Sequence, residues 1–95
     1  ISPAAAQRVT LSGTVMRSDT SLPVIGASLF VVQTGAGTVT DEEGRFSLSL
    51  PPGVYDIELS SVGYRRDREH IVVNQNRTVV FRLVSKTFEL DEIQV

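Results

Sequence analysis

Few side chains in this sequence have the chemistry that a catalytic or metal site requires. The 95 residues include no cysteine and one histidine, His70, which removes thiolate ligands, disulfides and thiol nucleophiles. Counting residues leaves a Ser/His/Asp arrangement open, but no segment resembles the strained turn that presents a nucleophilic serine. We therefore expect His70 at the surface, at a strand end, and we do not expect an enzyme acting alone.

Three consecutive acids, Asp41, Glu42 and Glu43, are a candidate calcium site. Calcium loops place such ligands at alternating positions and end in a bidentate glutamate. Adjacent acids followed by Gly44, which can adopt a positive φ, are typical of a solvated turn instead. The sequence therefore predicts no metal and no cofactor.

The basic residues do not form a nucleic-acid surface. Nine Lys and Arg stand against eleven Asp and Glu, which gives a net charge of -2. The one basic cluster, Arg65, Arg66 and Arg68, is interrupted by Asp67, which favours a solvated charged turn over a phosphate site. The longest apolar run, Leu29–Val32, is far shorter than the roughly 18 residues of a spanning helix. We expect neither a nucleic-acid partner nor direct membrane insertion by this segment.

Apolar and polar residues alternate along most of the chain after Arg8, which predicts β-strands. Ile25, Ala27, Leu29 and Val31 alternate, but Phe30 and Val32 are apolar as well, so this strand is expected to be covered on both faces, at least in part. About seven short strands separated by turn signals predict an all-β, antiparallel sandwich. The inward-facing residues are expected to include Val9, Leu11, Val15, Phe46, Leu48, Leu50, Tyr55, Ile57, Leu59, Val79, Phe81 and Leu83.

The two ends differ from this pattern. Residues 1–7 are expected to be a flexible leader, and Ala4-Ala5-Ala6 has the small-residue character of a signal-peptidase site. The domain itself is predicted over residues 8–84. Residues 85–95 are expected to be a linker and an extended tail of mixed apolar and acidic residues. Spacing alone leaves two interpretations of the tail open, an eighth edge strand or a peptide that adds to another protein's sheet.

Five short motifs in order resemble one family over residues 8–84. They are Leu11-Ser12-Gly13-Thr14-Val15, Leu22-Pro23-Val24-Ile25-Gly26-Ala27-Ser28, the run from Gly37 to Leu48, Pro52-Gly53-Val54-Tyr55 and Ser61-Val62-Gly63-Tyr64. The set is similar to the carboxypeptidase regulatory-like domain. That resemblance implies a seven-strand, Greek-key sandwich of the transthyretin (prealbumin) type.

The tail adds a second resemblance. Leu90-Asp91-Glu92-Ile93-Gln94-Val95 resembles the segment after this domain in TonB-dependent outer-membrane receptors of the Bacteroidetes type, where it acts as, or lies near, the TonB box. Gln94 departs from that pattern, because an apolar residue is usual there. The resemblance implies that Leu90, Asp91, Glu92, Ile93 and Val95 bind a partner.

Together the two resemblances imply a non-catalytic N-terminal domain on the periplasmic face of the outer membrane. Its partners would be TonB or another periplasmic protein, and the plug and barrel of its own full-length chain. Two alternatives stay open. One is an accessory domain of a zinc carboxypeptidase, and the other is an extracellular adhesion or stalk module.

Overall fold

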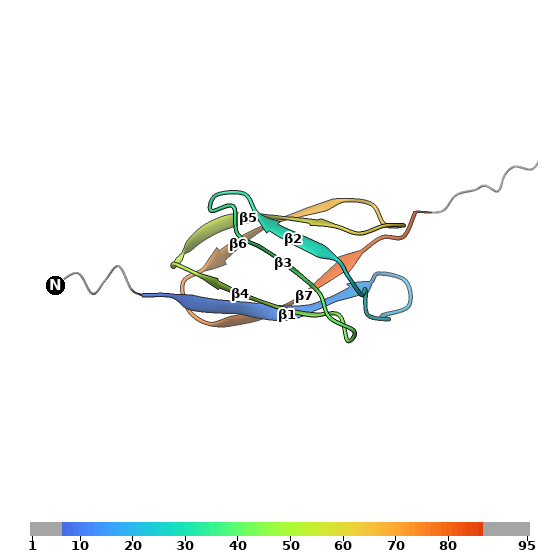
Figure 1. Cartoon of the computed structure of the whole chain (residues 1–95), viewed down its shortest axis with the longest axis horizontal. Coiled ribbons are helices and arrows are strands. Elements are labelled where there is room, and N and C mark those ends of the chain that lie inside the picture. The colour runs from blue at the N-terminus through green and yellow to red at the C-terminus, as the bar shows by residue number, and fades with distance from the viewer. Residues whose placement is uncertain (1–6, 87–95) are drawn as a thin grey trace, which may run out of the picture.

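The structure is a computed structural model that describes residues 7–86 of the chain (Figure 1). Its strands are β1 (Val9–Arg17), β2 (Ser28–Val31), β3 (Gly37–Val39), β4 (Arg45–Leu50), β5 (Gly53–Ser60), β6 (Asp67–Val73) and β7 (Arg77–Leu83). The prediction of an all-β domain of seven strands is confirmed. No helix within residues 7–86 is long and apolar enough to cross a membrane.

The strands form two sheets that pack face to face as a sandwich. One sheet has the order β4-β1-β7 and the other the order β3-β2-β5-β6. Figure 1 shows β1, β4 and β7 in one layer and β2, β5 and β6 in the layer opposite. Alternate side chains of each strand point between the layers, because successive Cβ atoms project to opposite faces of a sheet.

The predicted inward-facing residues make up most of the core. Leu11, Leu29, Ile57, Leu59 and Leu83 are almost completely buried. The full buried cluster consists of Val9, Leu11, Val15, Val24, Ala27, Leu29, Val31, Phe46, Leu48, Leu50, Tyr55, Ile57, Leu59, Ile71, Val73, Phe81 and Leu83. Val79, which was also predicted to face inward, packs against this cluster in a partly buried position.

One pairing differs from the predicted antiparallel arrangement. β7 runs parallel to β1, with Gly13 opposite Val79 and Val15 opposite Phe81, whereas the four other pairings are antiparallel. The turn at residues 74–76 carries the chain from one sheet to the other, so β7 does not form a hairpin with β6. Alternation of side chains specifies which face is buried and not the direction of the strand, so the sequence pattern could not show this.

The expectation of a strand covered on both faces near residues 25–32 is wrong. Leu29 and Val31 are buried, but Phe30 is 43% exposed and Val32 is 38% exposed. The regular strand is only Ser28–Val31, and no described element covers its outer face. Phe30 lies on that face between Gly37 of β3 and Glu58 of β5.

Gly13 occupies the middle of the central strand β1 because the neighbouring strands approach it too closely for a side chain. A Cβ atom added there would lie 1.8 Å from the carbonyl oxygen of Val79. β4 and β7 flank β1 on either side. Phe46 of β4 and Phe81 of β7 stack on each other, with ring centroids 5.8 Å apart and planes at 9°. Residue 13 is paired with Phe46 on one side and with Val79 on the other, so it lies between the two strands that carry the rings.

Candidate partner-binding site

The residues expected to bind a partner, Leu90, Asp91, Glu92, Ile93 and Val95, lie outside the described residues. What the structure describes is how the chain leaves the sandwich before this segment. That exit is built from Val84, Ser85 and Lys86, which follow β7 directly.

The exit segment is fastened to the connection between β5 and β6. The amide of Arg65 donates to the carbonyl of Val84 at 2.8 Å, and the amide of Lys86 donates to the carbonyl of Gly63 at 2.9 Å. Tyr64 and Ser85 form an antiparallel bridge between these two bonds. Since β7 and β5–β6 belong to opposite sheets, the bridge ties the two layers together at this end.

Two residues shape the connection that receives the exit segment. Gly63 has a φ of 87°, a conformation that a residue with a Cβ atom seldom adopts. Tyr64 is partly buried and packs against the core, as expected for a residue that caps this end of the sandwich. The carbonyl of Leu83 accepts a hydrogen bond from the Ser18 amide at 2.9 Å, which holds the end of β7 against the β1 side.

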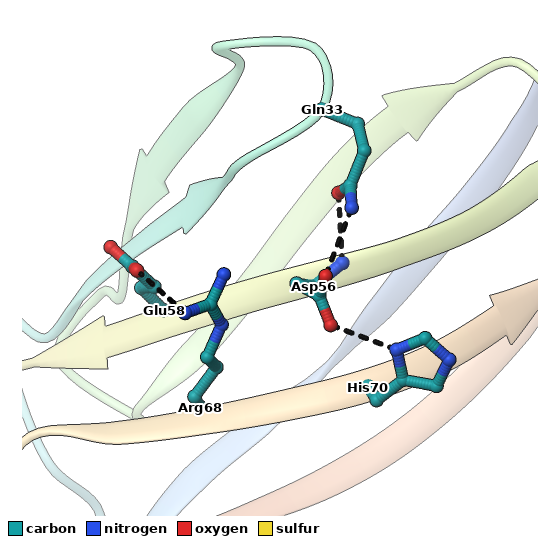
Figure 2. Close-up of polar contacts among 5 residues, drawn as sticks. All are labelled: Gln33, Asp56, Glu58, Arg68 and His70. Atoms are coloured by element: carbon teal, nitrogen blue, oxygen red, sulfur yellow. Dashed lines mark hydrogen bonds and ion pairs between the residues drawn. The ribbon is translucent and has the colours of Figure 1, made fainter.

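A polar network lies on the outer face of β5 and β6 (Figure 2). Nδ1 of His70 is 2.8 Å from Oδ1 of Asp56, and the Gln33 amide donates to the other carboxylate oxygen at 3.0 Å. The hydrogen bond with His70, followed by that from Gln33, lowers the pKa of Asp56 below its ordinary value of 3.8. Arg68 faces Glu58 two residue pairs further along the same face, with 3.7 Å between guanidinium and carboxylate.

The polar network on β5 and β6 consists of hydrogen bonds and ion pairs between surface side chains, and it does not resemble a catalytic site. The His70 side chain is 69% exposed, and Asp56 is the one described side chain that it contacts by a hydrogen bond or ion pair. No serine or threonine hydroxyl of residues 7–86 bonds to it, so the network lacks a nucleophile. His70 is exposed as expected, but it stands within β6 and not at a strand end.

In the acidic turn at Asp41, Glu42 and Glu43, the Asp41 carboxylate accepts hydrogen bonds from backbone amides. Oδ1 of Asp41 accepts hydrogen bonds from the amides of Glu43 at 2.9 Å and Arg45 at 2.8 Å, which stabilises the turn ending at Gly44. Gly44 has the positive φ, 75°, that the sequence predicted. Within residues 7–86 no group of three or more His, Asp or Glu side chains is arranged to hold a metal ion.

The basic cluster is only partly a turn. Arg65 and Arg66 lie in the connection, but β6 begins at Asp67, so Arg68 stands on the sheet opposite Glu58. The apolar residues Ile71, Val72 and Val73 are the last three of the seven residues of β6. The sequence signal for the first part of β6 is the alternation of Arg68 and His70 with Asp67 and Glu69. All four side chains are polar, so the segment resembles a charged turn when only its composition is considered.

Comparison with known proteins identifies the family. The sequence model of the CarboxypepD_reg-like domain matches residues 11–95. The chain belongs to this family. The match extends through the segment that contains Leu90 and Ile93, so this CarboxypepD_reg-like domain includes the acidic–apolar tail within its matched length.

Three relatives of this CarboxypepD_reg-like domain are TonB-dependent receptors by name, and two of them illustrate the match. TonB-dependent receptor SusC of Bacteroides thetaiotaomicron is 36% identical over 90 residues, 95% of this chain and 8% of the receptor. TonB-dependent receptor P39 of Formosa agariphila is 31% identical over 85 residues, 90% of this chain and 8% of the receptor. The chain thus spans about a twelfth of the length of these relatives.

The fold has counterparts among solved structures. The 5-hydroxyisourate hydrolase of Klebsiella pneumoniae superposes with a TM-score of 0.63 at 22% identity, covering 82% of this chain and 91% of that one. At this identity the likeness concerns the sandwich alone.

Proposed function

We propose that this domain is the non-catalytic, periplasmic N-terminal domain of a TonB-dependent outer-membrane transporter. In this proposal the tail at residues 87–95 couples the transporter to TonB, and the sandwich contacts its own plug and barrel. The observation that carries it is the pair of TonB-dependent receptors that match 90% and 95% of the chain.

The exit segment supports the coupling role mechanically. A segment that transmits force needs a firm attachment, and the backbone bonds of Val84 and Lys86 to the β5–β6 connection provide one. Those bonds engage residues immediately before the tail, and they join both sheets to it. We infer that load applied to residues 87–95 is borne by the whole sandwich and not by β7 alone.

An extended tail would engage TonB by adding to a sheet edge, in which backbone hydrogen bonds supply affinity and alternate side chains supply selectivity. Proline removes one backbone donor and alanine removes only side-chain contacts. In the full-length receptor, Leu90→Pro with Ile93→Pro should abolish TonB-dependent uptake. The matched variant, Leu90→Ala with Ile93→Ala, should retain part of it.

Uptake that survives both proline substitutions at wild-type receptor abundance would refute the coupling role. The alternatives make different predictions about the full-length protein. The transporter requires a plug and a barrel after residue 95, an accessory domain requires a peptidase domain before it, and a stalk module requires tandem copies.

A further inference from the structure

A groove runs across the end of the sandwich at which the exit segment is fastened. It consists of two adjoining hollows, both lined by Ser28, Ser60 and Arg66. We call it the exit groove and define it by Ser28, Phe30, Ser60, Val62, Arg66 and Lys86. Lys86, the last described residue, lines the half next to the exit segment, whereas Phe30 lines the far half on the sheet face.

The half of the exit groove next to Lys86 is basic. Arg66 and Lys86 line it, no acidic side chain does, and neither cation forms an ion pair with another described residue. In the far half, Arg68 is already paired with Glu58, and Asp67 adds a further negative charge. Uncompensated positive charge is therefore concentrated where the chain enters the tail.

Exposed apolar side chains accompany these charges. Val62 is 99% exposed beside Lys86, and the exposed ring of Phe30 lies at the far end of the groove. Water-exposed apolar groups beside unpaired cations favour a ligand that offers both apolar side chains and carboxylates.

We propose that residues 87–95 dock in the exit groove of their own sandwich. The groove begins at Lys86, the residue directly before this segment, so no intervening chain has to be accommodated. The segment contains Glu89, Asp91 and Glu92 and no Lys or Arg, and it contains Phe88 and Leu90. Nine extended residues reach about 30 Å, more than a groove crossing the width of a few neighbouring strands requires.

The regulatory consequence rests on the proposed function. A docked tail withholds Leu90 and Ile93 from TonB, so TonB binds only the fraction of molecules in which the tail is free. Because the tail is attached beside the groove, its effective concentration there is high, of the order of millimolar for a short tether. Displacement by TonB would then expose the exit groove to a second contact.

The test uses the chain 1–95, which has no cysteine of its own, with Gln94→Cys carrying a nitroxide spin label. Docking predicts loss of the amide signals of Ser60, Val62 and Arg66 by paramagnetic broadening. The amides of Ser12 and Ser47, on the other sheet, should be unaffected. Equal broadening of amides on both sheets would overturn the proposal. So would broadening confined to Lys86 and the tail, with no loss of the Ser60, Val62 and Arg66 signals.

Charge variants separate docking from simple proximity. Arg66→Glu with Lys86→Glu should restore the groove signals. Arg45→Glu with Arg82→Glu, which makes the same charge change on β4 and β7 of the opposite sheet, should leave them broadened. Groove signals that stay broadened in the double variant would contradict the electrostatic basis. A second sample mixes spin-labelled chains of natural isotope content with ¹⁵N chains that carry no spin label. Broadening of the groove signals in this sample would identify a second copy as the occupant and overturn the intramolecular proposal.

These measurements contain no TonB, so they fail or succeed independently of the proposed function. A separate titration with the periplasmic domain of TonB distinguishes the two. If docking and its regulatory role hold, Arg66→Glu with Lys86→Glu should bind TonB more tightly than the wild-type chain. Equal affinity, with docking otherwise demonstrated, would remove the regulatory role and leave the docking contact.

Discussion

Substitution of Gly13 by alanine tests the packing that holds β7, and with it the exit segment, in place. The new Cβ atom would lie 1.8 Å from the Val79 carbonyl oxygen and 2.8 Å from its carbonyl carbon. Since real contacts of this kind stay beyond 3.0 Å, the two strands must separate by more than an ångström. The obstacle is backbone and not a flexible side chain, so the strain cannot be relieved by a rotamer change.

Overpacking of a core costs about 1–3 kcal/mol and occasionally more, and we expect roughly 3 kcal/mol for a backbone clash in the central strand. For a domain of this size, each kcal/mol lowers the melting temperature by roughly 4–8 °C, which gives a decrease of about 12–24 °C. The ladder between β1 and β7 should loosen first, since Gly13 and Val79 are directly paired.

Gly35→Ala is the matched control. Gly35 has a φ of 77°, but no atom lies within 4 Å of an added Cβ, so only the left-handed backbone conformation opposes alanine. That penalty is about 1–2 kcal/mol. Thermal unfolding followed by circular dichroism should therefore rank Gly13→Ala clearly below Gly35→Ala, and the reverse order or equal midpoints would refute the reasoning.

Two further predictions concern polar contacts. Thr40 is a buried residue, only 4% exposed. Its hydroxyl accepts a hydrogen bond from the Ala27 amide at 2.8 Å and donates one to the Val24 carbonyl at 2.6 Å. Thr40→Val leaves both partners unsatisfied and should reduce the free energy of unfolding by roughly 2–4 kcal/mol. Thr40→Ser keeps the hydroxyl and should reduce it by about 1 kcal/mol, and urea titration can measure both values. The lowered pKa of Asp56 stabilises the fold above pH 3.8 and this contribution is lost as the pH falls through the lowered value. Asp56→Asn should therefore show a smaller loss of stability than wild type between about pH 5 and pH 2, and parallel profiles would contradict the pairing with His70.

The buried face of the fold could be predicted from the sequence because alternation encodes it directly. Phe46, Leu48 and Leu50 alternate with Arg45, Ser47 and Ser49 and are buried as expected. The direction of β7 could not be predicted, because parallel and antiparallel strands bury the same alternate residues. Phe30 was assigned to a covered face because apolar character suggests burial, whereas many exposed surface positions are apolar.

The candidate site was predictable only in part. The tail residues were proposed from a local motif, which needs no knowledge of tertiary contacts. The fastening of Val84 and Lys86 to Gly63 and Arg65 is a backbone contact between segments some 20 residues apart, and it leaves no side-chain pattern in the sequence. The Asp56–His70 pair depends on the register of β5 and β6, which becomes defined only when the strands pair.

Binding of TonB by the tail of this CarboxypepD_reg-like domain is a proposal that can be tested in solution. Titration of the ¹⁵N-labelled chain 1–95 with the periplasmic domain of TonB tests it most directly. If the tail binds TonB, saturable shifts should be largest for Leu90 to Ile93 and smaller for exit-groove amides such as Ser60 and Arg66. Binding should be lost in Leu90→Pro with Ile93→Pro. An absence of saturable change in residues 87–95, or shifts that persist unchanged in the proline variant, would contradict it.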